Sequence, residues 1–129
     1  MTSPFDPIAG ASTLAELQDA ETTEGWRATA TAAAPGLDDW IAGAVFGGTY
    51  QRPALTIRDR QLLNLAAIAA LGGADPQLVG HIRTCKRIGM TSEEISEAVV
   101  HLIPYIGLPR AMAALRMVNT AASDGSSER

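Results

Sequence analysis

The stretch that decides the fold is at residues 52–73 and reads RPALTIRDRQLLNLAAIAALGG. Thr56 and Asp59 stand three residues apart, as in a box that caps the start of a helix. The apolar run that follows ends at Gly72 and Gly73, a typical helix stop. The run Leu62–Leu71 is only about half of the roughly 20 apolar residues needed to cross a bilayer. The stretch therefore predicts a buried central helix in a soluble protein that does not enter the membrane.

Helix signals also precede this stretch. Thr13 is expected to cap a first helix, with Glu16 reaching back three residues later. A second helix from residue 24 should stop before Pro35, because a residue that precedes proline avoids helical angles. A stripe of apolar residues then predicts a helix that ends at Gly47-Gly48 and faces the core or a partner: Leu37, Trp40, Ile41, Ala44 and Val45.

The C-terminal half carries further helix starts and stops. Asp75-Pro76 opens a helix that Gly89 ends, and Thr91 with Glu94 forms the clearest capping box. Pro104 is expected to close that helix, and Pro109 to open a last one that runs towards Ala122. Alternation with period two is missing. The sequence therefore predicts an all-α, compact domain of about six helices with no sheet.

Both ends of the chain are rich in small and polar residues that have little to hold them down. We expect a flexible segment at 1–12, one helical domain at 13–122 and a disordered tail at 123–129.

Composition limits the function classes. The net charge is −4 and the ten basic residues are dispersed, which argues against nucleic acid as a partner. The single cysteine excludes an internal disulfide, and the first residues do not resemble a signal peptide, so we expect a cytoplasmic protein. An apolar fraction of 47% in 129 residues suggests contacts between subunits.

His81 and Cys85 are the most suggestive pair for chemistry. They lie four residues apart and so on the same face of a predicted helix. An imidazole that titrates near neutral pH suits general acid or base catalysis. A neighbouring thiol is a candidate nucleophile, although a free cysteine is more often packing material. Zinc binding by His81, Cys85 and His101 lacks a recognised ligand spacing, so no metal is expected.

Other candidates have strong structural alternatives. His101 lies near the C-terminal end of a predicted helix, where the helix dipole stabilises a protonated imidazole. A capping role therefore competes with a catalytic one. Arg52, Arg58 and Arg60 cluster at the start of the central helix and suit carboxylate binding, although surface ion pairing explains any one of them.

Residues 52–73 and 77–116 together resemble the carboxymuconolactone decarboxylase family, a branch of the alkylhydroperoxidase D-like superfamily. The resemblance extends over about 35–122 and rests on the order of its elements. These are the Arg-Pro turn at Arg52, Arg60 opening an alanine- and leucine-rich helix, His81 eight residues before Gly89, the Thr-x-x-Glu box with a trailing Glu97, His101, and finally Tyr105, Gly107 and Pro109.

The resemblance implies an alkylhydroperoxidase D-like helical fold, a homo-oligomer of three or six subunits with active sites near their contacts, and no cofactor. It implies decarboxylation of a γ-carboxylated butenolide in the catabolism of aromatic compounds. The related thiol peroxidases carry a CxxC pair ahead of the matching histidine. Here those two positions are Ala74 and Gln77, so a thiol peroxidase is excluded.

Three departures from the family pattern concern the pocket. Decarboxylases of this group commonly carry an acidic residue where Gly48 stands, and a small residue in place of Arg110. Pro104, directly before Tyr105, is also unusual. These departures suggest that the pocket has been altered.

Loss of carbon dioxide from a butenolide sends electrons to the lactone carbonyl. The site therefore needs cationic donors that face the carbonyl oxygen and an acid that protonates carbon. We expect His81 to be the proton donor, in a sheltered apolar hollow between helices, and Arg52 or Arg60 to hold a carboxylate or the oxyanion. The remaining expected substrate-binding residues are His101, Tyr105 and Cys85.

Two alternatives remain at the level of sequence. The same apparatus suits an isomerase, elimination or cyclisation enzyme of a biosynthetic pathway that acts on another conjugated carbonyl compound. The other alternative is an oligomeric binding protein without catalysis.

Overall fold

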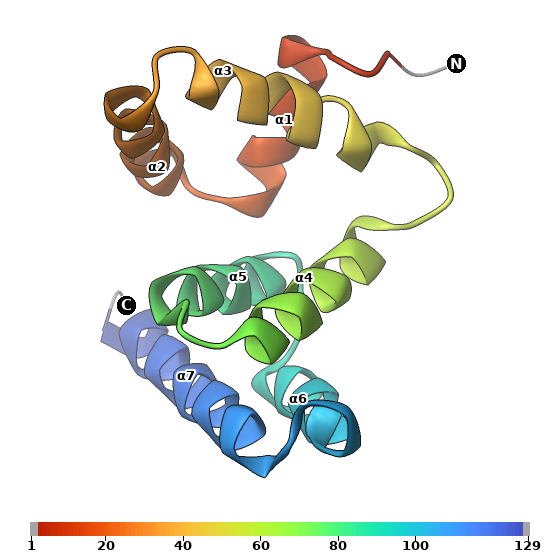
Figure 1. Ribbon diagram of the computed structural model, residues 1–129, viewed down its shortest axis with the longest axis vertical. Coiled ribbons are helices and arrows are strands. Elements are labelled where there is room, and N and C mark those ends of the chain that lie inside the picture. The colour runs from red at the N-terminus through yellow and green to blue at the C-terminus, as the bar shows by residue number, and fades with distance from the viewer. Residues whose placement is uncertain (1–2, 128–129) are drawn as a thin grey trace. The chain divides into compact units, whose positions relative to one another are not determined.

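The structure, a computed structural model, describes the backbone of residues 3–127 and the side chains of residues 3–121. Every regular element in this range is helical (Figure 1), which confirms the all-α class. Seven α-helices are present here, where about six were expected: α1 Pro7–Leu17, α2 Ala20–Ala33, α3 Leu37–Trp40, α4 Ile57–Leu71, α5 Asp75–Arg87, α6 Ser92–Ile106 and α7 Leu108–Ser127. A π-helix, η1 Ile41–Phe46, and a 3₁₀ turn, η2 Thr49–Gln51, link α3 to α4.

The chain divides into two compact units, Met1–Ile57 and Arg58–Arg129. No helix of the described residues has both the length and the apolar character required of a membrane span.

Glycines allow α1 and η1 of the first unit to pack closely. A Cβ on Gly10 would overlap the carbonyl oxygen of Ala42, and one on Gly47 would overlap that of Asp6. The ring of Phe5 covers Gly43 in the same way. Backbones can approach this closely only where no side chain intervenes.

The expected helix start at Thr13 is wrong, because α1 begins six residues earlier. Asp6 caps it by accepting hydrogen bonds from the backbone N–H groups of Ile8 and Ala9 at 3.1 and 3.0 Å. Proline at the first position favours this start. Thr13 is buried within the helix and its hydroxyl accepts a hydrogen bond from Gln51 Nε2 at 2.8 Å.

The expected helix over residues 37–45 is present and ends before Gly47-Gly48 as predicted, but it changes to a π-helix at Ile41. Hydrogen bonds in a π-helix join residues five apart, so η1 changes which residues share a face. Trp40 is 56% exposed, and the buried residues of η1 are Ala42 and Gly43.

The second unit is built on α5, α6 and α7, with α7 packed against both α5 and α6 (Figure 1). Helix α4 adds a narrow stripe to their core through Leu65 and Ala69. The expected buried central helix is therefore buried along one stripe only, since Leu63 is 58% exposed. The other members of this core are Leu78, Ile82, Cys85, Met90, Ile95, Val99, Ala111, Ala114, Val118 and Ala121.

Most of the expected helix ends in this unit are confirmed. Helix α4 ends at Leu71, before Gly72 and Gly73, which both have positive φ. In the capping box of α6, Thr91 Oγ1 accepts from Glu94 N and Glu94 Oε1 accepts from Thr91 N, each at 3.0 Å.

Two expected ends are wrong. Pro104 lies inside α6, which continues to Ile106 and ends at Gly107 with φ 87°. The proline cannot donate the helical hydrogen bond to the residue four positions earlier, yet the helix continues for two more residues. Helix α7 continues to Ser127, past the expected end at Ala122 and into the segment expected to be disordered. Residues 128–129 of that segment lie outside the described residues.

Candidate active site

Helix α5 positions His81 at the border of the core. The buried face of this helix consists of Leu78, Ile82 and Cys85, which recur at helical spacing. His81 lies between them along the helix and is half-buried. Its ring is therefore held by packing on one side.

A buried amide on α4 contacts this ring. Gln61 is only 1% exposed, and its Oε1 lies 3.4 Å from His81 Nδ1. Asn64 Nδ2 donates to the same oxygen at 3.5 Å. The three side chains form a polar group between α4 and α5.

Burial lowers the pKa of His81 below its usual 6.5. A partly buried imidazole loses hydration that the charged form needs more than the neutral form. At pH 7 the ring is therefore mainly neutral.

Cys85 is fully enclosed by the core, with 0% of its surface exposed. Burial raises the pKa of its thiol to about 11, against the smaller opposing effects of a backbone hydrogen bond and of Arg58. A thiol rather than a thiolate is present at neutral pH, and only the thiolate is a strong nucleophile. The structure thus favours packing over nucleophilic or substrate-binding roles for this residue.

The three expected arginines have different environments. Arg60 is half-buried directly before Gln61, and its Nε atom is buried. Arg58 forms an ion pair with Glu94 at 2.9 Å. Arg52 is exposed and belongs to the unit Met1–Ile57, so it is not grouped with the others in one compact unit.

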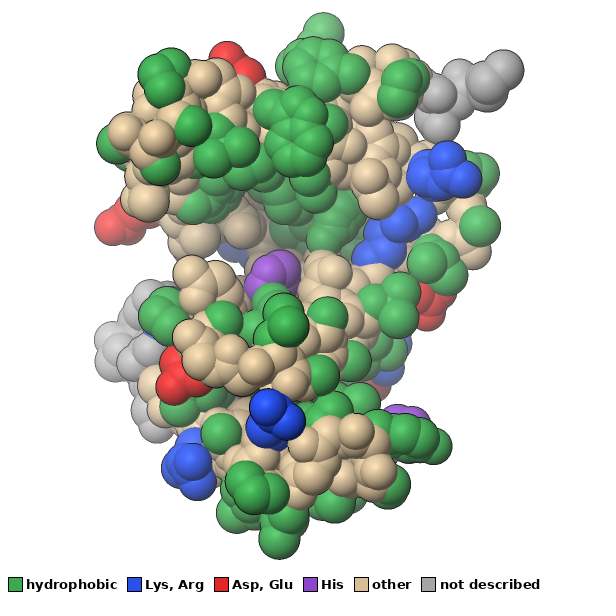
Figure 2. All heavy atoms as spheres, in the orientation of Figure 1, with side chains coloured by type: hydrophobic (Ala, Val, Ile, Leu, Met, Phe, Trp, Pro, Cys, Tyr) green, Lys and Arg blue, Asp and Glu red, His purple; other side chains and the backbone are tan. Residues whose placement is uncertain are grey.

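His101 and Tyr105 form a separate, exposed pair on α6. Their ring centroids are 5.8 Å apart, and Tyr105 is 76% exposed. Hydrophobic side chains gather on the surface over the end of α6 and the start of α7 (Figure 2), where Leu108 is 57% exposed. Among the described side chains, no hydrogen bond or ring contact joins this pair to His81.

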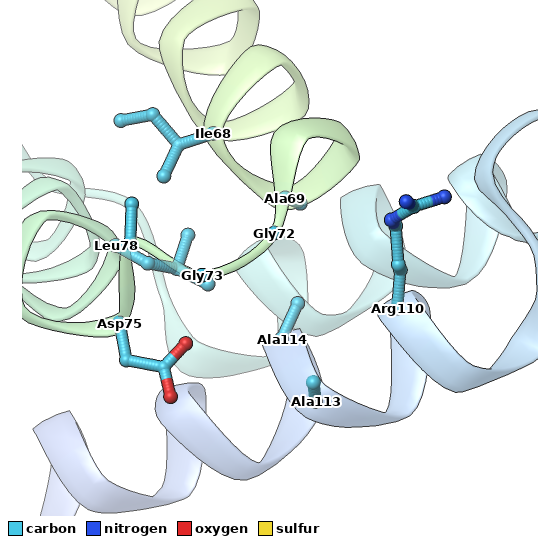
Figure 3. A pocket seen from close by; sticks show the side chains of 10 residues that line it. Ile68, Ala69, Gly72, Gly73, Asp75, Leu78, Arg110, Ala113 and Ala114 are labelled. Carbon is cyan, nitrogen blue, oxygen red and sulfur yellow. The ribbon is translucent and has the colours of Figure 1, made fainter.

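A small pocket lies where the end of α4, the start of α5 and the start of α7 meet (Figure 3). Asp75 and Arg110 lie at its polar edges, and Ile68, Leu78 and Ala114 form part of its apolar wall. Its volume of about 50 Å³ is well below the roughly 300–1,000 Å³ typical of ligand sites. His81 is not among its lining residues, so the expected hollow at His81 stays a prediction.

Comparison with known proteins identifies the family. The model of the carboxymuconolactone decarboxylase family matches residues 35–120. The chain belongs to this family. The resemblance drawn from the order of the motifs is therefore confirmed.

Two relatives show how much of the sequence is shared with known members. A 4-carboxymuconolactone decarboxylase of Acinetobacter baylyi is 34% identical over 88 residues, which make up 68% of this chain and 65% of that protein. An uncharacterized 15.0 kDa protein of Paracoccus denitrificans is 32% identical over 84 residues, 64% of this chain and 63% of that protein. The chain thus covers slightly less than two thirds of either relative.

The sequence analysis did not predict Gln61 and Asn64 as residues of the candidate site. Gln61 precedes Leu65 and Ala69 at intervals of four residues, so it occupies the first position of the buried stripe of α4. A polar residue at a predicted core position is a signal, because an amide is buried only where it is hydrogen-bonded. The sequence could not show that this residue contacts His81, because the contact joins α4 to α5 in the folded structure.

Proposed function

We propose that this protein is a cofactor-independent carboxy-lyase that acts on a small carboxylated lactone or a related conjugated carbonyl compound, with His81 as its general acid and base. The observation that carries the proposal is the half-buried His81 ring held by a buried amide in a member of this family. The printed activity of the Acinetobacter relative supports the choice of a decarboxylase.

The chemistry needs one proton for each carbon dioxide released. The bond between the ring carbon and the carboxylate breaks, and its electron pair moves through the double bond to the lactone carbonyl, which becomes an oxyanion. A guanidinium, for which Arg60 or Arg52 is our choice, stabilises that oxyanion. The electrons then return to carbon, and the protonated His81 ring supplies the proton that forms the new C–H bond.

Incubation with 4-carboxymuconolactone, with carbon dioxide measured, tests the proposal. We expect turnover by the wild type and a loss of about 10² to 10⁴-fold in His81→Gln. Thr120→Ala, on the exposed surface of α7, serves as the control and should retain turnover. Equal rates in wild type and His81→Gln, with unchanged circular dichroism, would remove His81 from the mechanism.

One observation favours an altered reaction, namely an isomerisation, elimination or cyclisation in a biosynthetic pathway. A Cβ at Gly48 would overlap the carbonyl oxygens of Pro4 and Ala44, so this backbone has no room for the acidic side chain common at that position in the decarboxylases. A folded protein that binds the lactone but releases no carbon dioxide would support this second candidate. A protein whose ligand affinity does not depend on His81 would support a binding protein instead.

We also propose that the enzyme works as a homo-oligomer, a trimer or hexamer, in the cytoplasm. The large exposed apolar side chains near the turn between α6 and α7 support this assembly. In such an assembly we expect the exposed His101 and Tyr105 to lie near a neighbouring subunit.

A further inference from the structure

Gln61 is an exception among the buried residues of the second unit. It is 1% exposed, as enclosed as Leu65 one turn later, and its amide is placed against an imidazole. Burying an amide without hydrogen bonds is destabilising. An apolar side chain at this position would avoid that requirement, so the contacts of the amide call for an explanation.

The amide oxygen faces the histidine ring. A carbonyl oxygen only accepts hydrogen bonds, so the contact of 3.4 Å between Gln61 Oε1 and His81 Nδ1 is a hydrogen bond only if Nδ1 carries the proton. Asn64 Nδ2, a donor, approaches the same oxygen at 3.5 Å. This donor opposes a flipped Gln61 amide, which would set NH₂ against NH₂.

We propose that Gln61 is a positioning residue that holds the neutral His81 ring as its Nδ1–H tautomer, so that Nε2 is the nitrogen that takes up and delivers the catalytic proton. The nitrogen that carries the proton is set by the hydrogen bond that the other nitrogen makes. Here the acceptor is a neutral amide, which orients the ring without adding charge.

For the reaction, this inference rests on the proposed function. The neutral ring has no proton on Nε2, so it first takes one proton from solvent at Nε2 and becomes imidazolium. It then gives that proton to a carbon of the conjugated system that holds the electron pair left by carbon dioxide, and the neutral Nδ1–H ring is restored. The carboxylate and one proton are consumed, and carbon dioxide and a C–H bond are formed.

Nitrogen-15 NMR of histidine-labelled protein tests the tautomer without any substrate. At a pH where the ring is neutral, we expect the His81 signals to show a protonated Nδ1 and an unprotonated Nε2. His101, the second of only two histidines, is exposed and provides reference signals, assigned by their absence in His101→Gln. A wild-type His81 ring with its proton on Nε2 would overturn the inference.

Two substitutions then test the role of Gln61. Gln61→Leu has no acceptor, so the His81 signals should shift towards the Nε2–H form while those of His101 stay in place. Gln61→Glu keeps an acceptor and should restore the proton on Nδ1. Unchanged His81 signals in a folded Gln61→Leu protein would contradict the role.

Turnover separates this inference from the proposed function. If both are right, Gln61→Leu lowers kcat by roughly tenfold or more, the scale on which misplaced catalytic groups slow reactions, and Gln61→Glu recovers part of it. If the tautomer shifts as expected but no lactone is turned over, the proposed function is wrong and the assignment of Gln61 holds.

Discussion

At the scale of single residues, Cys85 shows how burial decides between two readings of one side chain. The pair His81 and Cys85 suggested nucleophilic chemistry from spacing alone, and both do lie on α5. Only the structure shows that the thiol has no exposed surface, whereas the imidazole is half-buried. The same helix face thus carries a packing residue and a candidate catalytic residue four positions apart.

We predict that Cys85→Ser retains turnover but is less stable than the wild type. The hydroxyl replaces a thiol in an apolar core, which costs about 1–3 kcal/mol if it lacks a hydrogen-bond partner. Because the pKa of the thiol is raised to about 11, the folded wild type should also resist a thiol-specific disulfide reagent at pH 8. Urea unfolding and the labelling rate, with the denatured protein as control, measure both effects. Rapid labelling of the folded protein, or complete loss of turnover in the serine variant, would support Cys85 as a nucleophile after all.

We predict that His81 makes the protein less stable in mild acid. Its pKa in the folded state is lowered from 6.5, so between these two values the unfolded chain binds more protons than the folded chain. This contribution is fully present above pH 6.5 and is lost as the pH falls towards the folded-state value. Urea unfolding at about pH 7.5 and about pH 5.5 should show the loss in the wild type and a smaller loss in His81→Gln.

The effect of His81 on stability can be separated from those of other groups that titrate in acid. Glu94 also has a lowered pKa, caused first by its hydrogen bond from the Thr91 backbone, but its contribution is lost only below 4.5. His101 is present in both proteins. An identical pH dependence in wild type and His81→Gln would show that burial does not affect the titration of His81.

At the scale of elements, the capping box of α6 is a strong test of what local sequence dictates. Both reciprocal hydrogen bonds between Thr91 and Glu94 are present, as the pattern predicted. We predict that Thr91→Ala lowers the free energy of unfolding by about 0.5–2 kcal/mol. Ser92→Ala, one residue later, removes a similar hydroxyl without removing the cap and should change stability much less. Equal losses in the two variants would mean that the cap contributes little.

The elements also show where sequence reasoning succeeds and where it fails. Caps and glycine stops are local, so the ends at Thr91, Gly72 and Gly89 were predictable from a few neighbouring residues. The start of α1 was missed because Asp6 with Pro7 was assigned to a loose end, although Asp before Pro is a good helix start. The π-helix η1 was missed because no local sequence pattern records its hydrogen bonds or its close packing against α1.

The candidate site divides in the same way. His81 was predictable as a residue type with useful chemistry, and its place on a helix beside Cys85 follows from spacing. Gln61 was not, because its contact with His81 joins two helices at a sequence separation of 20 residues. The environments of His101 and Tyr105 were not predictable either, since only packing decides that both are exposed.

At the scale of the whole molecule, the exposed apolar surface of the second unit argues for self-association. Large side chains there are well exposed, and a soluble monomer seldom carries many such side chains close together. The most exposed are Leu63 at 58%, Leu71 at 75%, Tyr105 at 76%, Leu108 at 57% and Met112 at 44%. Three of them lie within eight residues at the end of α6 and the start of α7.

We therefore predict that the protein in solution has three or six times the 13.5 kDa mass of the chain. Light scattering coupled to size-exclusion chromatography measures this mass directly. The double variant Tyr105→Ser with Leu108→Ser should shift the mass downwards, because apolar burial at about 25 cal/mol per Å² drives association. Thr120→Ala, also exposed on α7 but polar, should leave it unchanged. A wild-type mass of 13.5 kDa at every concentration would show that no second copy of the chain covers the exposed face. His101 and Tyr105 would then lie on an open surface and not at a subunit contact.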